Sequence, residues 1–188
     1  MPKISTQRLL ARRRGIVLAA TRCLQRKGLE NTGMRDVFRA ANLSPGAVYR
    51  YFAGKEELLA AVAAESPSIA EAALASTETV GDPVARLRAL LEAAAEGGLP
   101  ARLQVELQAA ALGSPAIAAA LGERRTASHR ALAKALQGPG GAPPREAVDL
   151  VLATCEGLAR SRLLDPEAEA AAQAAAAERL LAPLLDRA

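Results

Sequence analysis

The side chains best suited to chemistry gather in one short N-terminal stretch of this 188-residue chain. This stretch contains the Ser44 hydroxyl, the small residues Pro45, Gly46 and Ala47, the sequence Tyr49-Arg50-Tyr51 and the Lys55 ammonium group. Hydroxyl, guanidinium and ammonium groups donate hydrogen bonds to phosphate oxygens and base edges, and a residue such as Ala47 can pack on a thymine methyl group. The combination indicates contact with a nucleic acid.

Patterns typical of enzymes and metal sites are missing from the sequence. The one histidine, His129, and the two cysteines, Cys23 and Cys155, are far apart, whereas a zinc site needs three or four such ligands. No GxSxG, Walker or GxGxxG pattern occurs. We therefore expect no enzyme activity, no cofactor and no metal, and we expect both cysteines to be reduced and buried.

Charge is distributed unevenly along the chain. The first 64 residues carry 12 Lys and Arg against 4 Asp and Glu, whereas residues 65–188 carry 12 against 16. A basic head suits a protein that binds phosphates, because each contact releases counterions from the nucleic acid. A solvated basic surface would give the same counts, so charge alone does not decide between the two.

The composition predicts an all-α protein. Aromatic residues make up 2% of the chain, so Ala, Leu, Val and Ile must build the core, and Ala and Leu favour helix most strongly. Helical periodicity and Pro/Gly breaks predict about nine helices, at residues 6–27, 33–40, 45–51, 55–76, 83–96, 100–112, 115–137, 144–164 and from 165 onward. We expect one domain at 1–64 and another at 65–188. With no membrane-length apolar run and no secretion signal, we expect a cytoplasmic protein without membrane contact.

The segment around residue 42 predicts a helix-turn-helix. Asn42 is the residue best suited to a left-handed backbone in the four-residue turn that ends at Ser44. Ser44 is expected to cap the next helix, and Pro45 suits its first position. Gly28 is expected to end the first helix in a left-handed conformation. In this geometry the second helix of the pair enters the DNA major groove.

The sequence from Gly28 to Leu58 carries a family resemblance. Thr32-Gly-Met-Arg-Asp-Val37, Ala41-Asn-Leu-Ser-Pro-Gly-Ala-Val-Tyr-Arg-Tyr-Phe52 and Lys55-Glu-Glu-Leu58 resemble the TetR (tetracycline repressor) family of one-component regulators. The match is dense over about Ile16 to Val62. Two positions depart from the family pattern: Phe38 stands where a small residue is usual, and Gly33 replaces a hydroxyl residue that caps the helix.

The resemblance implies a double-stranded DNA operator as partner. The residues expected to bind it are Thr32, Arg35, Ser44, Pro45, Gly46, Ala47, Tyr49, Arg50, Tyr51 and Lys55. In this scheme Thr32, Arg35 and Lys55 hold phosphate, and Ser44 to Ala47 face base edges. Lys55 has independent support, because a helix N-terminus and a cation together favour an anion. Either tyrosine could instead pack the small domain, and Phe52 is expected in its core.

The resemblance also implies that the C-terminal part binds a small-molecule effector and forms a homodimer. Because every aromatic residue lies between Phe38 and Phe52, the effector pocket is expected to be aliphatic. The residues expected to line it are Leu103, Gln104, Leu107, Gln108, Leu121, Arg125, His129, Cys155 and Glu156. Two apolar stripes on the last two helices are expected to form the dimer interface: Val148, Val151, Leu152, Cys155, Ala170, Ala174, Ala177, Leu181 and Leu184. Packing within the chain's own core is the competing interpretation of these stripes.

Three functions are compatible with these features. The leading one is a transcriptional regulator, expected to be a repressor that an effector releases from a palindromic operator. The second is a non-specific architectural DNA-binding protein that uses the same basic head. The third is an enzyme with a helical body, which the missing catalytic pattern disfavours.

Overall fold

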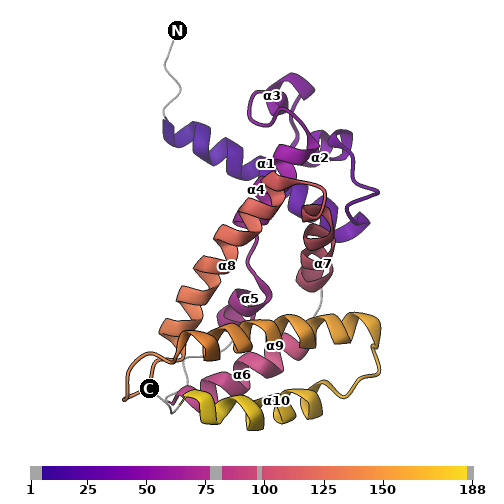
Figure 1. The fold of residues 1–188 in the computed structure, drawn as a ribbon. Helices are drawn as coiled ribbons and strands as arrows, with labels where there is room; N and C mark the ends of the chain where they lie inside the picture. The colour runs from indigo at the N-terminus through magenta and orange to yellow at the C-terminus, as the bar shows by residue number, and fades with distance from the viewer. Residues whose placement is uncertain (1–5, 77–81, 97–98, 186–188) are drawn as a thin grey trace. The chain divides into compact units, whose positions relative to one another are not determined.

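The protein is all-α, as its composition predicts (Figure 1). The computed structural model describes residues 6–76, 82–96 and 99–185. Over these ranges it contains ten helices and no strand, apart from an isolated bridge between Gly138 and Gly141. The helices are α1 (Thr6–Lys27), α2 (Met34–Ala41), α3 (Pro45–Tyr49), α4 (Lys55–Glu65), α5 (Ile69–Ser76), α6 (Pro83–Glu96), α7 (Leu99–Ala111), α8 (Pro115–Ala135), α9 (Arg145–Leu164) and α10 (Ala170–Leu185).

The tenth helix arises from a break in the segment predicted as one helix over 55–76. Pro67 disfavours helical geometry in the residue before it, and Ser66 accordingly has an extended backbone (φ −76°, ψ 134°). Ser68 then starts α5 with reciprocal caps, because its hydroxyl accepts from Glu71 N–H (3.1 Å) and its own N–H donates to the Glu71 carboxylate (2.9 Å). The prediction of a continuous helix was therefore wrong.

The first of two compact units comprises residues 1–66 and 106–123. In it, α1 packs against α2 and α4, and α2 packs against α3. Ile16, Val48 and Phe52 are fully buried, so the prediction that Phe52 belongs to the core is confirmed. Arg13 lies over the Phe52 ring at 5.0 Å from its centroid and forms an ion pair with Glu65, which closes the core on the α4 side.

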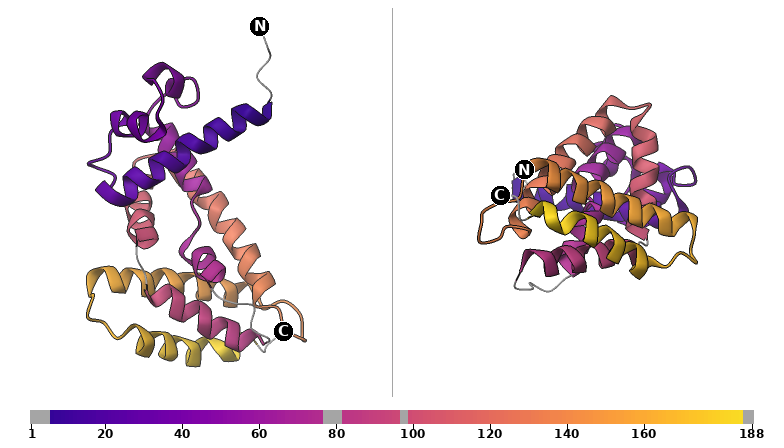
Figure 2. Two further views of the ribbon diagram at one scale, coloured as in Figure 1. Left: turned by 180° about the vertical axis from the view of Figure 1, so that it is seen from behind. Right: turned by 60° about the horizontal axis from the view of Figure 1, so that its bottom comes forward.

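The second compact unit comprises residues 67–105 and 124–188. Helix α6 contacts α5, α9 and α10, and α9 lies beside α10, as both views of Figure 2 show. The core is aliphatic and includes Leu87, Leu91 and Leu152. Because burial disfavours the thiolate, the pKa of the Cys155 thiol in this core is raised to about 12. Cys155 and Cys23 are both free and buried, as predicted.

The boundary of the first unit lies two residues from the predicted domain limit at residue 64. Residues 106–123, however, pack with the N-terminal segment. The assignment of separate DNA-binding and effector-binding domains remains a prediction. Within the described ranges, no single helix is long and apolar enough to cross a membrane, and only α4 and α5 counted together meet that requirement.

Candidate nucleic-acid interface

A carboxylate holds the start of α2 to the end of α1. Asp36 accepts a hydrogen bond from the Gly33 N–H (3.0 Å) and forms ion pairs with Lys27 (2.7 Å) and Arg39 (2.8 Å). The hydrogen bonds from Lys27 and then from Gly33 stabilise the ionised form, and the pKa of Asp36 falls to about 2. Asp36 thus satisfies the Gly33 N–H at the start of α2, although position 33 has no hydroxyl cap.

The turn of the helix-turn-helix has the predicted backbone. Asn42 lies in the left-handed region with φ 52°, the one non-glycine residue with positive φ in the described chain. Its N–H donates to the Arg39 carbonyl (3.2 Å), and the Leu43 N–H donates to the Phe38 carbonyl (3.1 Å). Gly28, at the end of α1, has φ 80°. Both left-handed assignments are confirmed.

Helix α3 is short and is held at both ends. The Ser44 hydroxyl accepts from the Ala47 N–H (3.3 Å), and Pro45 occupies the first turn, which confirms the predicted cap. Val48 is fully buried and anchors the helix from below. Pro45 and Gly46 remain exposed, and a Cβ added to Gly46 would meet no atom within 4 Å. The N-terminal end of α3 is therefore open to close approach by a ligand.

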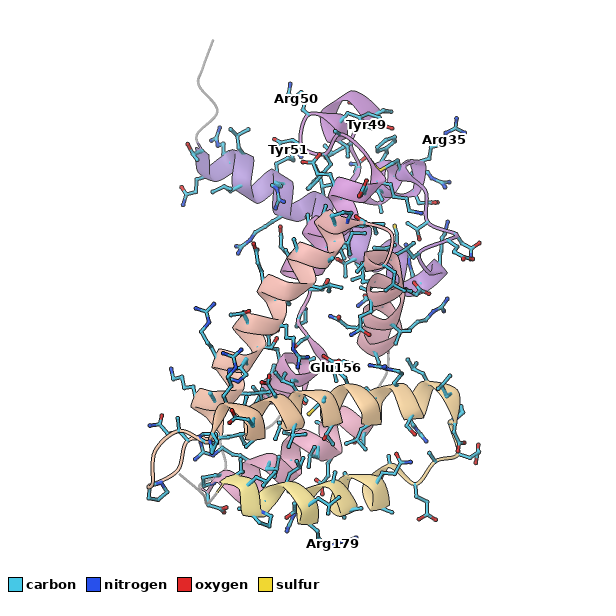
Figure 3. All side chains as sticks on the ribbon, viewed as in Figure 1. Arg35, Tyr49, Arg50, Tyr51, Glu156 and Arg179 are labelled. Atoms are coloured by element: carbon cyan, nitrogen blue, oxygen red, sulfur yellow. The ribbon has the colours of Figure 1, made fainter. Side chains whose placement is uncertain are left out.

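An aromatic pair positions the longest side chain of α3. The rings of Phe38 and Tyr49 meet edge-to-face, with centroids 5.5 Å apart and planes at 69°. Tyr49 is nevertheless 49% exposed. The bulky residue at position 38 therefore supports Tyr49 from α2 while about half of the Tyr49 residue stays exposed. Tyr51 is half-buried, and Arg50 is exposed at the projecting end of this segment (Figure 3).

A concavity of about 850 Å³ lies beside these residues. Three of the predicted DNA-binding residues line it: Arg35, Ser44 and Pro45. Four further residues line it that the sequence analysis did not assign to DNA: Phe38, Arg39, Asn42 and Leu43. The spacing of Arg35, Phe38 and Arg39 at i, i+3 and i+4 was the available signal, because such residues share one face of a helix.

Two of the predicted phosphate contacts have partners inside the protein. Thr32 is buried, and its hydroxyl donates to the Gly28 carbonyl (2.7 Å). The Lys55 ammonium donates to the Leu29 carbonyl (2.7 Å), and the Leu29 N–H donates to the Glu106 carboxylate (2.7 Å). Both residues stabilise the segment between α1 and α2, and a phosphate contact from either remains a prediction.

The residues predicted to bind an effector are divided between the two compact units, and their role remains a prediction. Leu107, Gln108 and Leu121 belong to the first unit, and the other six belong to the second. In the second unit, Arg125 forms an ion pair with Glu156 (3.8 Å), which is labelled in Figure 3, and the Gln104 amide donates to the Pro67 carbonyl (3.2 Å). A cavity of about 220 Å³ in this unit is instead lined by Ile69, Ala72, Ala73, Ser76, Ala93, Ala94, Glu96, Ala101 and Ala159.

The residues chosen for the dimer interface pack inside the chain. Six of them are buried: Val148, Val151, Leu152, Cys155, Ala174 and Leu181. The remaining three, Ala170, Ala177 and Leu184, are partly buried against the same core. These residues therefore pack against the chain's own core, as the competing interpretation describes, and a role in a dimer interface remains a prediction. The burial of these residues does not bear on whether the protein forms a dimer through other surfaces.

The fold and the interface define a helix-turn-helix protein with an all-α body. Residues 16–62 match the family model described as "Bacterial regulatory proteins, tetR family". The HTH-type transcriptional repressor Rv1474c of Mycobacterium tuberculosis is 38% identical over 78 residues, a segment that spans 42% of this chain and 41% of that protein. Residues 16–62 thus match the N-terminal region of TetR-family regulators.

Solved structures extend the similarity to nearly the whole chain. Salmonella enterica GusR is 27% identical with a TM-score of 0.66, covering 98% of this chain and 99% of GusR. A transcriptional regulator from Rhodococcus sp. RHA1 is 23% identical with a TM-score of 0.71, covering 92% and 95%. The multidrug binding protein EbrR, solved with proflavin, is 24% identical with a TM-score of 0.68, covering 92% and 99%. The last two show the fold alone.

The Asp36 clamp predicts a stability difference that depends on pH. The pKa of Asp36 is lower in the folded protein, so its contribution is complete above about pH 4, the ordinary pKa of an aspartate, and is lost as pH falls toward 2. We expect Asp36→Asn to be less stable than wild type in urea unfolding at pH 6, with the difference shrinking progressively below pH 4. A difference that stays constant from pH 6 to pH 2.5 would contradict the clamp.

Proposed function

We propose that this protein represses transcription by binding a palindromic operator as a homodimer and that a small aliphatic effector releases it. The observation that supports this most strongly is the accessible N-terminal end of α3, held by Ser44 and Val48 beside a concavity that contains Arg35 and Arg39. This end can reach base edges through backbone groups, methyl contacts and the supported Tyr49 ring. Because the proposed partner is chromosomal DNA, the proposal places the protein in the cytoplasm.

An architectural protein would use the same basic head without sequence preference. Selection from a random duplex library with the full chain separates the two functions. We expect a two-fold symmetric consensus and a discrete footprint over it at 0.15 M salt. Enrichment of no sequence, together with continuous protection of any duplex, would identify the architectural function instead.

The interface residues have different expected contributions to operator binding. Arg35→Ala and Tyr49→Ala should each weaken operator affinity by about tenfold or more, because each removes a contact to phosphate or base. Arg130→Ala is the matched control, because Arg130 is an exposed arginine of α8 in the second unit. Gel-shift titration of all three variants, with circular dichroism to confirm folding, makes the comparison. Equal affinity of Tyr49→Ala and Arg130→Ala would exclude Tyr49 from the interface.

The proposed dimer uses faces of α9 and α10 that the chain leaves exposed. On α9, Leu150 (49% exposed), Ala153, Gly157 and Leu164 (83%) recur at helical spacing. On α10, Leu180 is 76% exposed. A Cβ on Gly157 would meet nothing within 4 Å in the chain, although a glycine inside a helix is about 1 kcal/mol less favourable than alanine. A partner helix that packs closely at this position would explain the glycine.

Charged substitutions on these faces test the dimer. Leu150→Glu combined with Leu180→Glu should produce monomers in analytical ultracentrifugation at concentrations where the wild type is dimeric, because each burial of a carboxylate in the interface is unfavourable. Leu112→Glu is the control, since Leu112 is 92% exposed in the first unit. If the double variant sedimented as a dimer, the interface would lie elsewhere.

The effector part of the proposal rests on the 220 Å³ cavity. Its walls are mostly alanine methyl groups, and among the described residues that line it Glu96 is the one with a charged side chain. Pockets for drug-sized ligands usually measure about 300–1,000 Å³, so this cavity suits a smaller molecule. Aliphatic walls with a single carboxylate favour a short alkyl chain that carries a cationic or donor group.

Hexylamine and hexanoate are matched probes for this cavity. Hexylamine should release the wild-type protein from its operator in a gel shift, and hexanoate should not. Ala93→Leu should block release by filling the cavity, whereas Ala75→Leu, on the exposed side of α5, should respond as wild type. Equal release by both probes, or an unchanged response of Ala93→Leu, would contradict this assignment.

A further inference from the structure

A second basic groove lies on the first unit, between α1 and the end of α2. Its volume is about 480 Å³. Three arginines of α1, Arg8, Arg12 and Arg22, line it, and no acidic side chain of the described ranges does. The lining also contains small residues, among them Ala11, Gly15 and Ala41. The groove therefore combines three positively charged side chains with several small residues.

The arginines of α1 differ in whether they contact other side chains of the protein. Arg13, which lies outside the groove lining, forms an ion pair with Glu65 and packs over Phe52. Arg12 and Arg22 are exposed, and within the described residues neither has an ion-pair partner. Their charge is not needed to stabilise α1 against the rest of the unit and is free to meet an anion.

Gly15 is a second, independent sign of close approach. It stands in the middle of α1, where alanine would favour the helix more. A Cβ at this position would meet no atom within 4 Å, so packing within the chain does not require a glycine. A glycine here leaves the helix backbone accessible along the lining of the groove.

The position of the groove relative to α2 indicates its occupant. Leu43, in the helix-turn-helix turn, lines both this groove and the concavity that contains Arg35 and Ser44. A helix that enters the major groove is flanked by two sugar-phosphate strands, one on each side. In the proposed operator complex the concavity beside α3 faces the base edges and one strand, so the second strand has no assigned contact.

We propose that the α1 groove binds the second sugar-phosphate strand of the operator through Arg12 and Arg22. This inference rests on the proposed operator binding and extends its contact surface to α1. Because the contacts are to phosphate, they contribute equally on all sequences and add to the salt dependence of binding. They do not alter which bases are preferred.

The test compares two arginines of α1 on the selected operator. Arg12→Ala should lower affinity severalfold and reduce the slope of log affinity against log salt by about 0.9 for each phosphate that the variant no longer neutralises. Arg14→Ala, an exposed arginine two residues away that does not line the groove, should leave the slope unchanged. Ethylation interference should show phosphates that matter for wild type and for Arg14→Ala but no longer for Arg12→Ala.

A substitution at Gly15 separates binding from folding. Gly15→Gln places a helix-favouring, uncharged side chain in the groove, and we expect it to raise the melting temperature while weakening operator binding. Arg12→Ala with the slope and interference pattern of Arg14→Ala, or Gly15→Gln with wild-type affinity, would overturn the groove assignment. A wild-type protein that prefers no sequence would instead contradict the proposed function, so the two failures are distinguishable.

Discussion

The helix-turn-helix depends on one constraint: α3 has five residues, which is too few for a helix to be stable by itself. Its helical conformation must therefore be stabilised by contacts with the residues around it. The Val48 side chain is buried beneath α3, and Ser44 caps the first turn. Asn42 adopts the left-handed backbone conformation with which the chain turns from α2 into α3. Phe38 supports Tyr49 from α2 in the same way. Because Val48 packs on the buried side of α3, the exposed residues Pro45 and Gly46 are not needed to hold the helix in place.

Charged side chains also hold the backbone where helices meet. Leu29 is fixed at both its carbonyl and its N–H, by Lys55 from α4 and Glu106 from α7. Asp36 joins the end of α1 to the start of α2. Residues that a family resemblance implies for phosphate binding, such as Lys55, thus have a structural role in the protein without DNA. A hydrogen bond to a carbonyl and a phosphate contact use the same donor, and sequence cannot distinguish them.

The sequence predicted local structure well wherever one residue dictates the backbone. Gly28, Asn42 and Ser44 are in the predicted conformations, because the allowed backbone angles and the capping groups are properties of each residue. The missed break between α4 and α5 also had a local signal, namely a proline followed by a serine–glutamate capping pair. Which faces of α9 and α10 are buried was harder to predict. Val151 lies in the core and Leu150 on the surface, although the two residues are adjacent in sequence and both are apolar.

What the sequence by itself determined is the all-α class, the TetR-like character of residues 16–62 and the geometry of the helix-turn-helix, since these follow from residue types and short spacings. Only the tertiary structure decided which apolar stripe of α9 is core, which arginines of α1 line a groove, and that residues 106–123 pack with the head. These features depend on burial and on contacts between distant segments. The free energy of packing depends on contacts throughout the unit, so it cannot be predicted from a short stretch of sequence.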